Sequence, residues 1–138
     1  AGRVATLAAV RTVLRPGGAF VFSFHNLDYA RLSDSLRVRP RPVWREPLEF
    51  VWGLRRRAIA RKRRAVLKDS AVDGGSYRIL NDDGMNHGLL TYYTGLPAQT
   101  ALLRAAGFTD IAAVALDGSP VDPDRPFTRD YGIHVRAS

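Results

Sequence analysis

The stretch Val13-Leu-Arg-Pro-Gly-Gly-Ala-Phe-Val-Phe-Ser-Phe24 decides the fold class of this chain. Residues 3–14 place apolar side chains at the three- and four-residue spacing of a helix. The turn at 15–18 ends that helix, because proline cannot continue it and the glycines allow the chain to reverse. Residues 19–24 are then apolar on both faces, which is typical of a buried strand in a parallel sheet. A helix, a glycine turn and a buried strand in succession predict an α/β protein.

The rest of the chain contains further regular segments separated by polar loops. A Pro/Arg-rich connector at 37–47 precedes a helix at about 48–67. Residues 94–107 are predicted to form another helix, with Pro97 in its first turn and Gly107 at its end. Strands are predicted at 77–80, 89–93, 108–116 and 131–136, and a loop at 117–126.

Length and composition indicate one domain without a membrane span. The chain has 138 residues, 46% of them hydrophobic, which is enough for a packed core. No apolar run approaches the roughly 18 residues of a transmembrane helix, and the start shows no secretory signal pattern. Cysteine is absent, which suits a reducing compartment, so we expect a cytoplasmic protein.

The positive charge is concentrated in one segment. Residues 55–68 contain eight basic residues and no acid, which equals the formal net charge of +8 for the whole chain. The segment is interpreted as the solvated face of a helix. The alternative is a nucleic-acid-binding module in which Arg61, Arg63 and Arg64 contact phosphates. Contact with a membrane surface is a third option.

Several common site signatures are absent from the sequence. It has no phosphate-binding P-loop, no G-x-G-x-x-G fingerprint and no G-x-S-x-G elbow. The histidines are His25, His87 and His134, which are far apart in sequence, and without cysteine we expect no metal site. Residues 81–84 have part of a calcium-loop pattern but lack its closing glutamate, so a polar turn is expected there.

Three landmarks occur in an order that resembles one enzyme family. The helix, the Val13–Gly18 turn and the strand at 19–24 resemble the entry to the fifth strand of class I S-adenosylmethionine-dependent methyltransferases. Leu102–Phe108 is similar to the family's next helix and the start of its sixth strand. Residues 108–116 and 131–136 look like its antiparallel sixth and seventh strands. The resemblance covers 3–26 and 94–136.

This resemblance implies a partial doubly wound, Rossmann-like sheet with a mainly helical insertion. Residues 1–26 and 89–138 would form the core, and 27–88 would form an insertion or lid that carries the basic helix. The core strands would lie in the order fifth, seventh, sixth. The fifth strand would then keep an unpaired edge, through which a homo-oligomer could form.

The resemblance also implies a function. The chain would be the substrate-side half of a methyltransferase that acts on an oxygen or nitrogen of a small molecule. The family's glycine-rich loop and ribose-binding acid have no counterpart in this chain, so the isolated chain is expected to be inactive. S-adenosylmethionine, bound by the complete protein, would be touched only at its edge, by Ser23 and Phe24. A non-catalytic subunit that pairs with another chain is a further alternative.

Candidate site residues follow from the end of the strand at 19–24, because ligands of open α/β sheets bind beyond the carboxyl ends of strands. His25 is the candidate general base, and its alternative role is a hydrogen-bonded residue at the strand end. The candidate substrate-binding residues are Asn26, Asn86, His87, Tyr92 and Tyr93. Adjacent residues of a strand point to opposite faces, so at most one of the two tyrosines is expected in the pocket.

Overall fold

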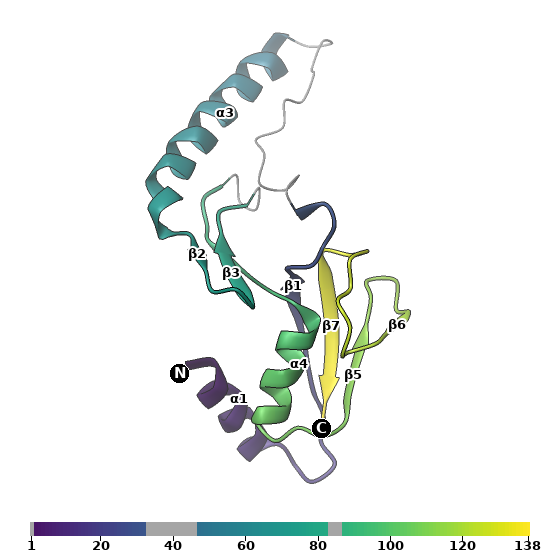
Figure 1. Ribbon diagram of the computed structural model, residues 1–138. Helices are drawn as coiled ribbons and strands as arrows, with labels where there is room; N and C mark the ends of the chain where they lie inside the picture. The colour runs from purple at the N-terminus through teal and green to yellow at the C-terminus, as the bar shows by residue number, and fades with distance from the viewer. Residues whose placement is uncertain (1, 33–46, 83–86) are drawn as a thin grey trace. The chain divides into compact units, whose positions relative to one another are not determined.

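The computed structural model describes residues 2–32, 47–82 and 87–138, and it is a mixed α/β structure (Figure 1). The α/β class is therefore confirmed. The predicted connector lies outside these residues, apart from Pro47, which begins a helix. The chain divides into two compact units, one formed by 1–30 and 93–138 and the other by 31–92.

The strands follow the order β2-β3-β4-β1-β7-β5-β6, and the boundary between the units falls within β4 (Thr91–Thr94). In the first unit, β1 (Phe20–Asn26) pairs antiparallel with β7 (Gly132–Ala137). β7 pairs antiparallel with β5 (Ile111–Val114). The strand at 131–136 is expected from the sequence to lie between those at 19–24 and 108–116, and the order β1-β7-β5 confirms this.

The turn before β1 is formed by two glycines and a hydrogen bond within residues 15–18. α1 (Gly2–Val13) ends where the sequence predicts, and Gly17 follows with φ +75°. The backbone N–H of Gly18 donates to the carbonyl of Arg15 at 2.7 Å. A Cβ at Gly18 would lie 2.8 Å from that same oxygen. Glycine is therefore required at both positions, at one for its φ and at the other for space.

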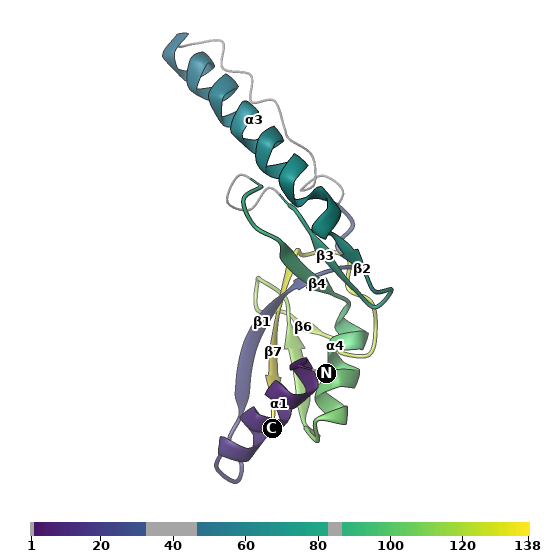
Figure 2. The same ribbon diagram turned by 90° about the vertical axis from the view of Figure 1, so that its left-hand side faces the viewer.

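The sheet of the first unit is covered by helices on one face. α1 and α4 (Leu96–Ala105) lie on the same side of the strands (Figure 2). Leu7 of α1, Leu103 of α4 and Ile133 of β7 belong to one buried cluster, joined by Phe108, which follows α4. Phe20, Phe22 and Phe24 pack against it from β1.

The other face of β1 is exposed, so the prediction that this strand is buried on both faces is wrong. Its residues alternate between half-buried and exposed from Phe20 to His25, and the side chain of Val21 is 66% exposed. Alternation of this kind indicates a sheet with a core on one side only. No helix among the described residues of this unit packs against that face.

The prediction of an unpaired edge on β1 needs a correction. At its carboxyl end, β1 pairs in parallel with β4, with His25 opposite Tyr93 and Asn26 opposite Thr94. A later segment of the chain thus occupies part of the edge that was expected to be free for another copy. Over residues 20–24, β1 has no partner among the described strands on that side.

The second unit contains α3 (Pro47–Leu67), a 3₁₀ turn at Lys68–Ser70, and the antiparallel pair β2 (Val72–Asp73) and β3 (Tyr77–Leu80). β3 and α3 are the elements that the sequence predicts. β2, and in the first unit β6 (Pro120–Val121), are short strands that the sequence pattern did not reveal. No helix in the described part of the chain has the length and apolar character needed to cross a membrane.

Candidate functional site

Successive side chains of β1 point to opposite faces of the sheet, which separates the two predicted cofactor contacts. Phe24 packs against the core below α1 and α4. Ser23 lies on the exposed face, where its Oγ is 2.6 Å from Nδ1 of His134 on β7. Neither side chain therefore offers an unused polar group at the end of the strand.

His25 and Tyr93 lie side by side at the carboxyl end of β1. Their rings have centroids 5.4 Å apart, as the parallel register of β1 and β4 requires. Tyr93 is 4% exposed, whereas His25 is open to solvent. The buried phenol ring thus lies against an imidazole that is open to solvent at the strand end.

Asn26 is fully buried, and its side chain holds a distant loop in place. Its amide donates to the carbonyls of Phe127 and Asp130, the latter at 3.0 Å. Its Oδ1 accepts a hydrogen bond from the backbone N–H of Asp28 at 3.1 Å. Both amide hydrogens are used inside the protein, so in this arrangement Asn26 positions the 127–131 loop beside His25.

Asp28 is a candidate site residue that the sequence reasoning did not single out. It lies two residues after the end of β1, against the end of β4, where a Cβ at Gly95 would come within 2.8 Å of its Oδ2. Partial burial raises the pKa of its carboxyl group. No described residue donates a hydrogen bond to that carboxylate. The sequence feature that could have identified Asp28 is its position two residues after Asn26, the last residue of the strand.

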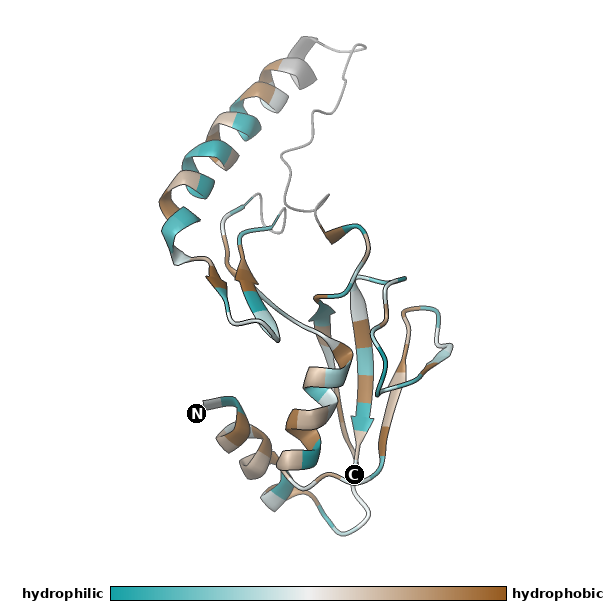
Figure 3. Cartoon of the chain, in the orientation of Figure 1, coloured by the Kyte–Doolittle hydropathy of each residue, from teal (hydrophilic) through white to brown (hydrophobic). Residues whose placement is uncertain are grey.

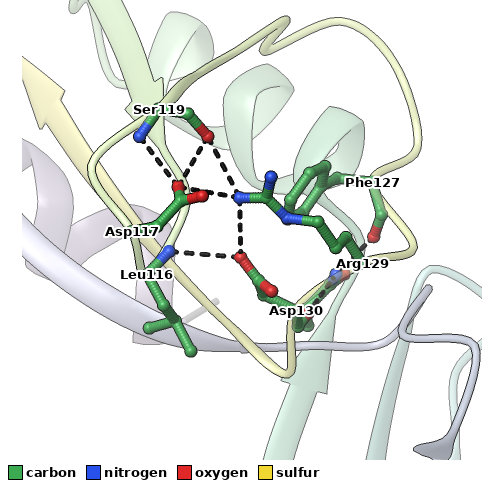
Figure 4. Close-up of polar contacts among 7 residues, drawn as sticks. Leu116, Asp117, Ser119, Phe127, Arg129 and Asp130 are labelled. Carbon is green, nitrogen blue, oxygen red and sulfur yellow. Dashed lines mark hydrogen bonds and ion pairs between the residues drawn. The ribbon is translucent and has the colours of Figure 1, made fainter.

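The 127–131 loop is also fixed from its outer side by a polar network (Figure 4). The Arg129 guanidinium donates to Asp117 at 2.8 Å, to Ser119 at 3.0 Å and to Asp130 at 3.3 Å. The backbone N–H of Leu116 donates to Asp130 at 3.2 Å. The turn between β5 and β6 is thereby tied to the loop that borders the end of β1.

This network makes a prediction about pH. Hydrogen bonds from the Ser119 hydroxyl and backbone lower the pKa of Asp117 to about 2 from its ordinary 3.8, with a smaller contribution from Arg129. Because the folded-state pKa is the lower one, the contribution to stability is complete above about pH 4 and is lost as the pH falls toward 2. We expect Ser119→Ala to raise the pKa of Asp117 more than Arg129→Gln does, measured by NMR titration of the carboxyl carbon.

Asp124 provides the control for that titration. Its pKa is also lowered, but through a hydrogen bond from Arg104. Neither Ser119→Ala nor Arg129→Gln should change the titration of Asp124. A larger shift of Asp117 in Arg129→Gln than in Ser119→Ala would contradict the dominant role of the Ser119 hydrogen bonds.

The remaining predicted substrate-binding residues belong to the second unit. Asn86 lies outside the described residues. His87 is fully buried, has φ +57°, and places Nδ1 3.1 Å from Oδ1 of Asn81. Tyr92 stacks on Tyr77 with ring centroids 5.4 Å apart. The two tyrosines thus have different neighbours, and Tyr93 is the one that joins His25.

The predicted phosphate-contacting residues Arg61, Arg63 and Arg64 are all exposed on α3. No group of three or more histidine or acidic side chains in the described ranges could hold a metal ion.

No family model, curated protein or solved structure matches the chain. The end of β1 is the candidate site, because the exposed His25 lies there beside Tyr93 of β4, and the Asp28 carboxylate lies two residues after the strand.

Proposed function

We propose that this chain is the substrate-side half of an S-adenosylmethionine-dependent methyltransferase that acts on a hydroxyl or amine of a small molecule. The observation that carries the proposal is the placement of an accessible imidazole at the carboxyl end of β1, with β7 and β5 beyond it in the order that the family resemblance implies. Ligands of open α/β sheets bind at such strand ends.

The incomplete sheet supports the same proposal. β1 is paired with β7 from Phe20 to His25, but with β4 only at His25 and Asn26. The strand therefore has room for a further neighbour over residues 20–24, beside a face that exposes Val21. A doubly wound sheet has helices on both faces. We infer that residues outside this sequence complete the sheet.

The described residues do not form a cofactor site by themselves. Phe24 is packed into the core and the Ser23 hydroxyl is engaged with His134, so the expected edge contacts are used within the protein. The proposal assigns the cofactor, which supplies an activated methyl group, to the rest of the parent protein.

The roles of this chain's own residues concern the methyl acceptor. His25 accepts a proton from the acceptor hydroxyl or ammonium, and the buried Tyr93 ring holds the imidazole in place. Asp28 offers a carboxylate to a hydroxyl or amine of the ligand at the end of β4. Asn26 keeps the 127–131 loop against the site. Positioning is expected to contribute more to the rate than proton transfer does.

The proposal predicts a specific loss of activity on changing His25. In the complete protein encoded around this segment, His25→Gln should lower methyl transfer to a panel of phenols and primary amines about 10²–10⁴-fold. The measurement is transfer of labelled methyl groups from S-adenosylmethionine. His134→Gln is the matched control, because His134 lies one strand away, opposite Ser23, and should keep its activity within a few-fold.

Two results would contradict the proposal. One is a coding sequence upstream of this segment that lacks a strand followed by a glycine-rich loop. The other is equal activity of the His25→Gln and wild-type proteins across the panel, which would leave His25 with a structural role at the strand end.

A further inference from the structure

α3 carries both large apolar and basic side chains at exposed positions. Five large apolar side chains are 40–72% exposed, namely Val51, Trp52, Leu54, Ile59 and Val66. The same helix and the residue after it carry the eight basic residues of 55–68, with no acid among them. Figure 3 shows brown and teal bands alternating along this helix. Burial against the described residues explains neither feature.

The apolar side chains lie in two adjacent rows along the helix. Trp52, Ile59 and Val66 recur every seven residues, and Val51 and Leu54 form the start of a second row beside them. Arg55 and Lys62 fall between the rows by the same geometry. The Arg55 guanidinium lies over the Trp52 ring, 5.8 Å from its centroid. Cations and apolar groups are thus interleaved on one surface, the α3 surface.

A shallow groove on this surface is also lined by both apolar and basic side chains. It has a volume of about 410 Å³ and is lined by Ile59, Val66 and Leu67 together with Lys62, Arg63 and Gly88. The groove offers apolar walls next to two cationic groups. An alkyl chain with an anionic head matches that chemistry better than a purely ionic ligand does.

The charge would attract nucleic acid or an anionic lipid surface, but only the lipid surface also uses the apolar rows. Nucleic acid is bound through phosphates, and its polar backbone leaves Val51, Leu54 and Val66 without a partner. It also favours aromatic side chains interleaved with the cations, whereas only one of the five is aromatic. A simple solvated face explains the arginines alone. Interfacial helices bury an apolar face among lipid headgroups while their basic residues meet anionic lipids.

We infer that α3 is a peripheral binding surface for an anionic phospholipid bilayer. The helix would lie in the plane of the headgroups, with Trp52, Ile59 and Val66 inserted at the acyl boundary and the basic residues contacting lipid phosphates. The chemistry of the acceptor site does not enter this inference, which stands whether or not the proposed methyl transfer is correct.

The test uses the whole 138-residue chain and lipid vesicles. Trp44→Phe leaves Trp52 as the only tryptophan, because the chain has two. Its emission should shift to shorter wavelength with phosphatidylcholine vesicles that contain roughly 30% phosphatidylserine. The shift should be absent with phosphatidylcholine alone. Co-sedimentation measures the affinity for the same vesicles, and circular dichroism checks that each variant is folded.

Two variants separate the charge from the apolar rows. Arg61→Gln/Lys62→Gln/Arg64→Gln should weaken binding to the anionic vesicles about a hundredfold, given the usual contribution of each basic residue near an anionic surface. Ile59→Gln/Val66→Gln keeps the charge and should weaken binding about tenfold or more. Arg15→Gln/Arg78→Gln/Arg125→Gln is the matched control: it lowers the net charge from +8 to +5 as the first variant does, but in residues that do not belong to α3, and should bind as the wild type.

The opposite outcomes overturn the inference. One is no binding to anionic vesicles by the folded chain. A second is vesicle binding that Ile59→Gln/Val66→Gln leaves unchanged. A third is tight, salt-dependent binding of a DNA duplex or single-stranded RNA that exceeds vesicle binding, is lost in the charge variant and is retained in the apolar variant. That pattern would assign α3 to nucleic acid.

Discussion

Calorimetry of S-adenosylmethionine, or of its demethylated product, with the 138-residue chain should show no binding at high micromolar concentrations. The family's glycine-rich loop and ribose-binding carboxylate have no counterpart in the sequence. The two residues at the expected cofactor edge are committed to the core and to His134. Losing two or three charge-assisted hydrogen bonds at about 1.5–3 kcal/mol each weakens binding by several orders of magnitude.

The control for this experiment is a measurement that the chain is folded. A cooperative urea transition, measured on the same sample, shows that an absent signal does not come from unfolded protein. Micromolar affinity for either ligand would contradict the half-domain proposal, because the chain would then build a cofactor site from other residues. No affinity in the complete protein as well would contradict the methyltransferase proposal as a whole.

Asn26→Ala should destabilise the chain by about 2–4 kcal/mol. The substitution removes the amide that donates to the Phe127 and Asp130 carbonyls. It also removes the acceptor of the Asp28 N–H. A buried polar group left without its partner costs about 1–3 kcal/mol, and the carbonyls would be only partly reached by water. The shift in the urea midpoint measures the loss, which is a large part of the usual 5–15 kcal/mol of a domain.

Ser23→Ala is the matched control for Asn26→Ala. Ser23 lies on the same strand and also bonds a distant residue, but it is exposed and should change the stability by less than about 0.5 kcal/mol. Asn26→Asp should be at least as unfavourable as Asn26→Ala at neutral pH, since a carboxylate would face the two carbonyl oxygens. A stability of Asn26→Ala within 0.5 kcal/mol of the wild type, on the order of the effect of a surface substitution, would show that the loop does not depend on this amide.

The same contacts connect stability with the proposed site. Asn26 holds the 127–131 loop from the end of β1, and Arg129 within the loop ties it to Asp117 in the turn after β5. The Ala30 N–H also donates to the Thr128 carbonyl at 3.0 Å. We therefore expect substitutions in this loop to affect ligand binding at His25 indirectly, by releasing the wall beside it.

The sequence by itself determined the elements whose causes are local. Pro16, Gly17 and Gly18 separate α1 from β1 by local effects. The proline ring cannot continue a helix, Gly17 has a positive φ, and a Cβ at Gly18 would contact the Arg15 carbonyl. Pro97 and Gly107, the latter with φ +90°, bound α4 for the same reason. The concentration of charge in 55–68 was likewise visible in the sequence, as was the candidate role of His25.

Only the tertiary structure decided which of these residues meet. The carbonyls that accept hydrogen bonds from the Asn26 amide lie 101 and 104 residues away in the sequence. No local pattern could therefore show that this predicted substrate-binding residue instead holds a loop in place. The choice between Tyr92 and Tyr93 depended on the register of β4 against β1. The sequence also did not reveal the exposed face of β1, because Val21 is as apolar as its half-buried neighbours and burial depends on what packs against a residue. Asp28 joined the site because β4, more than 60 residues later, ends beside it.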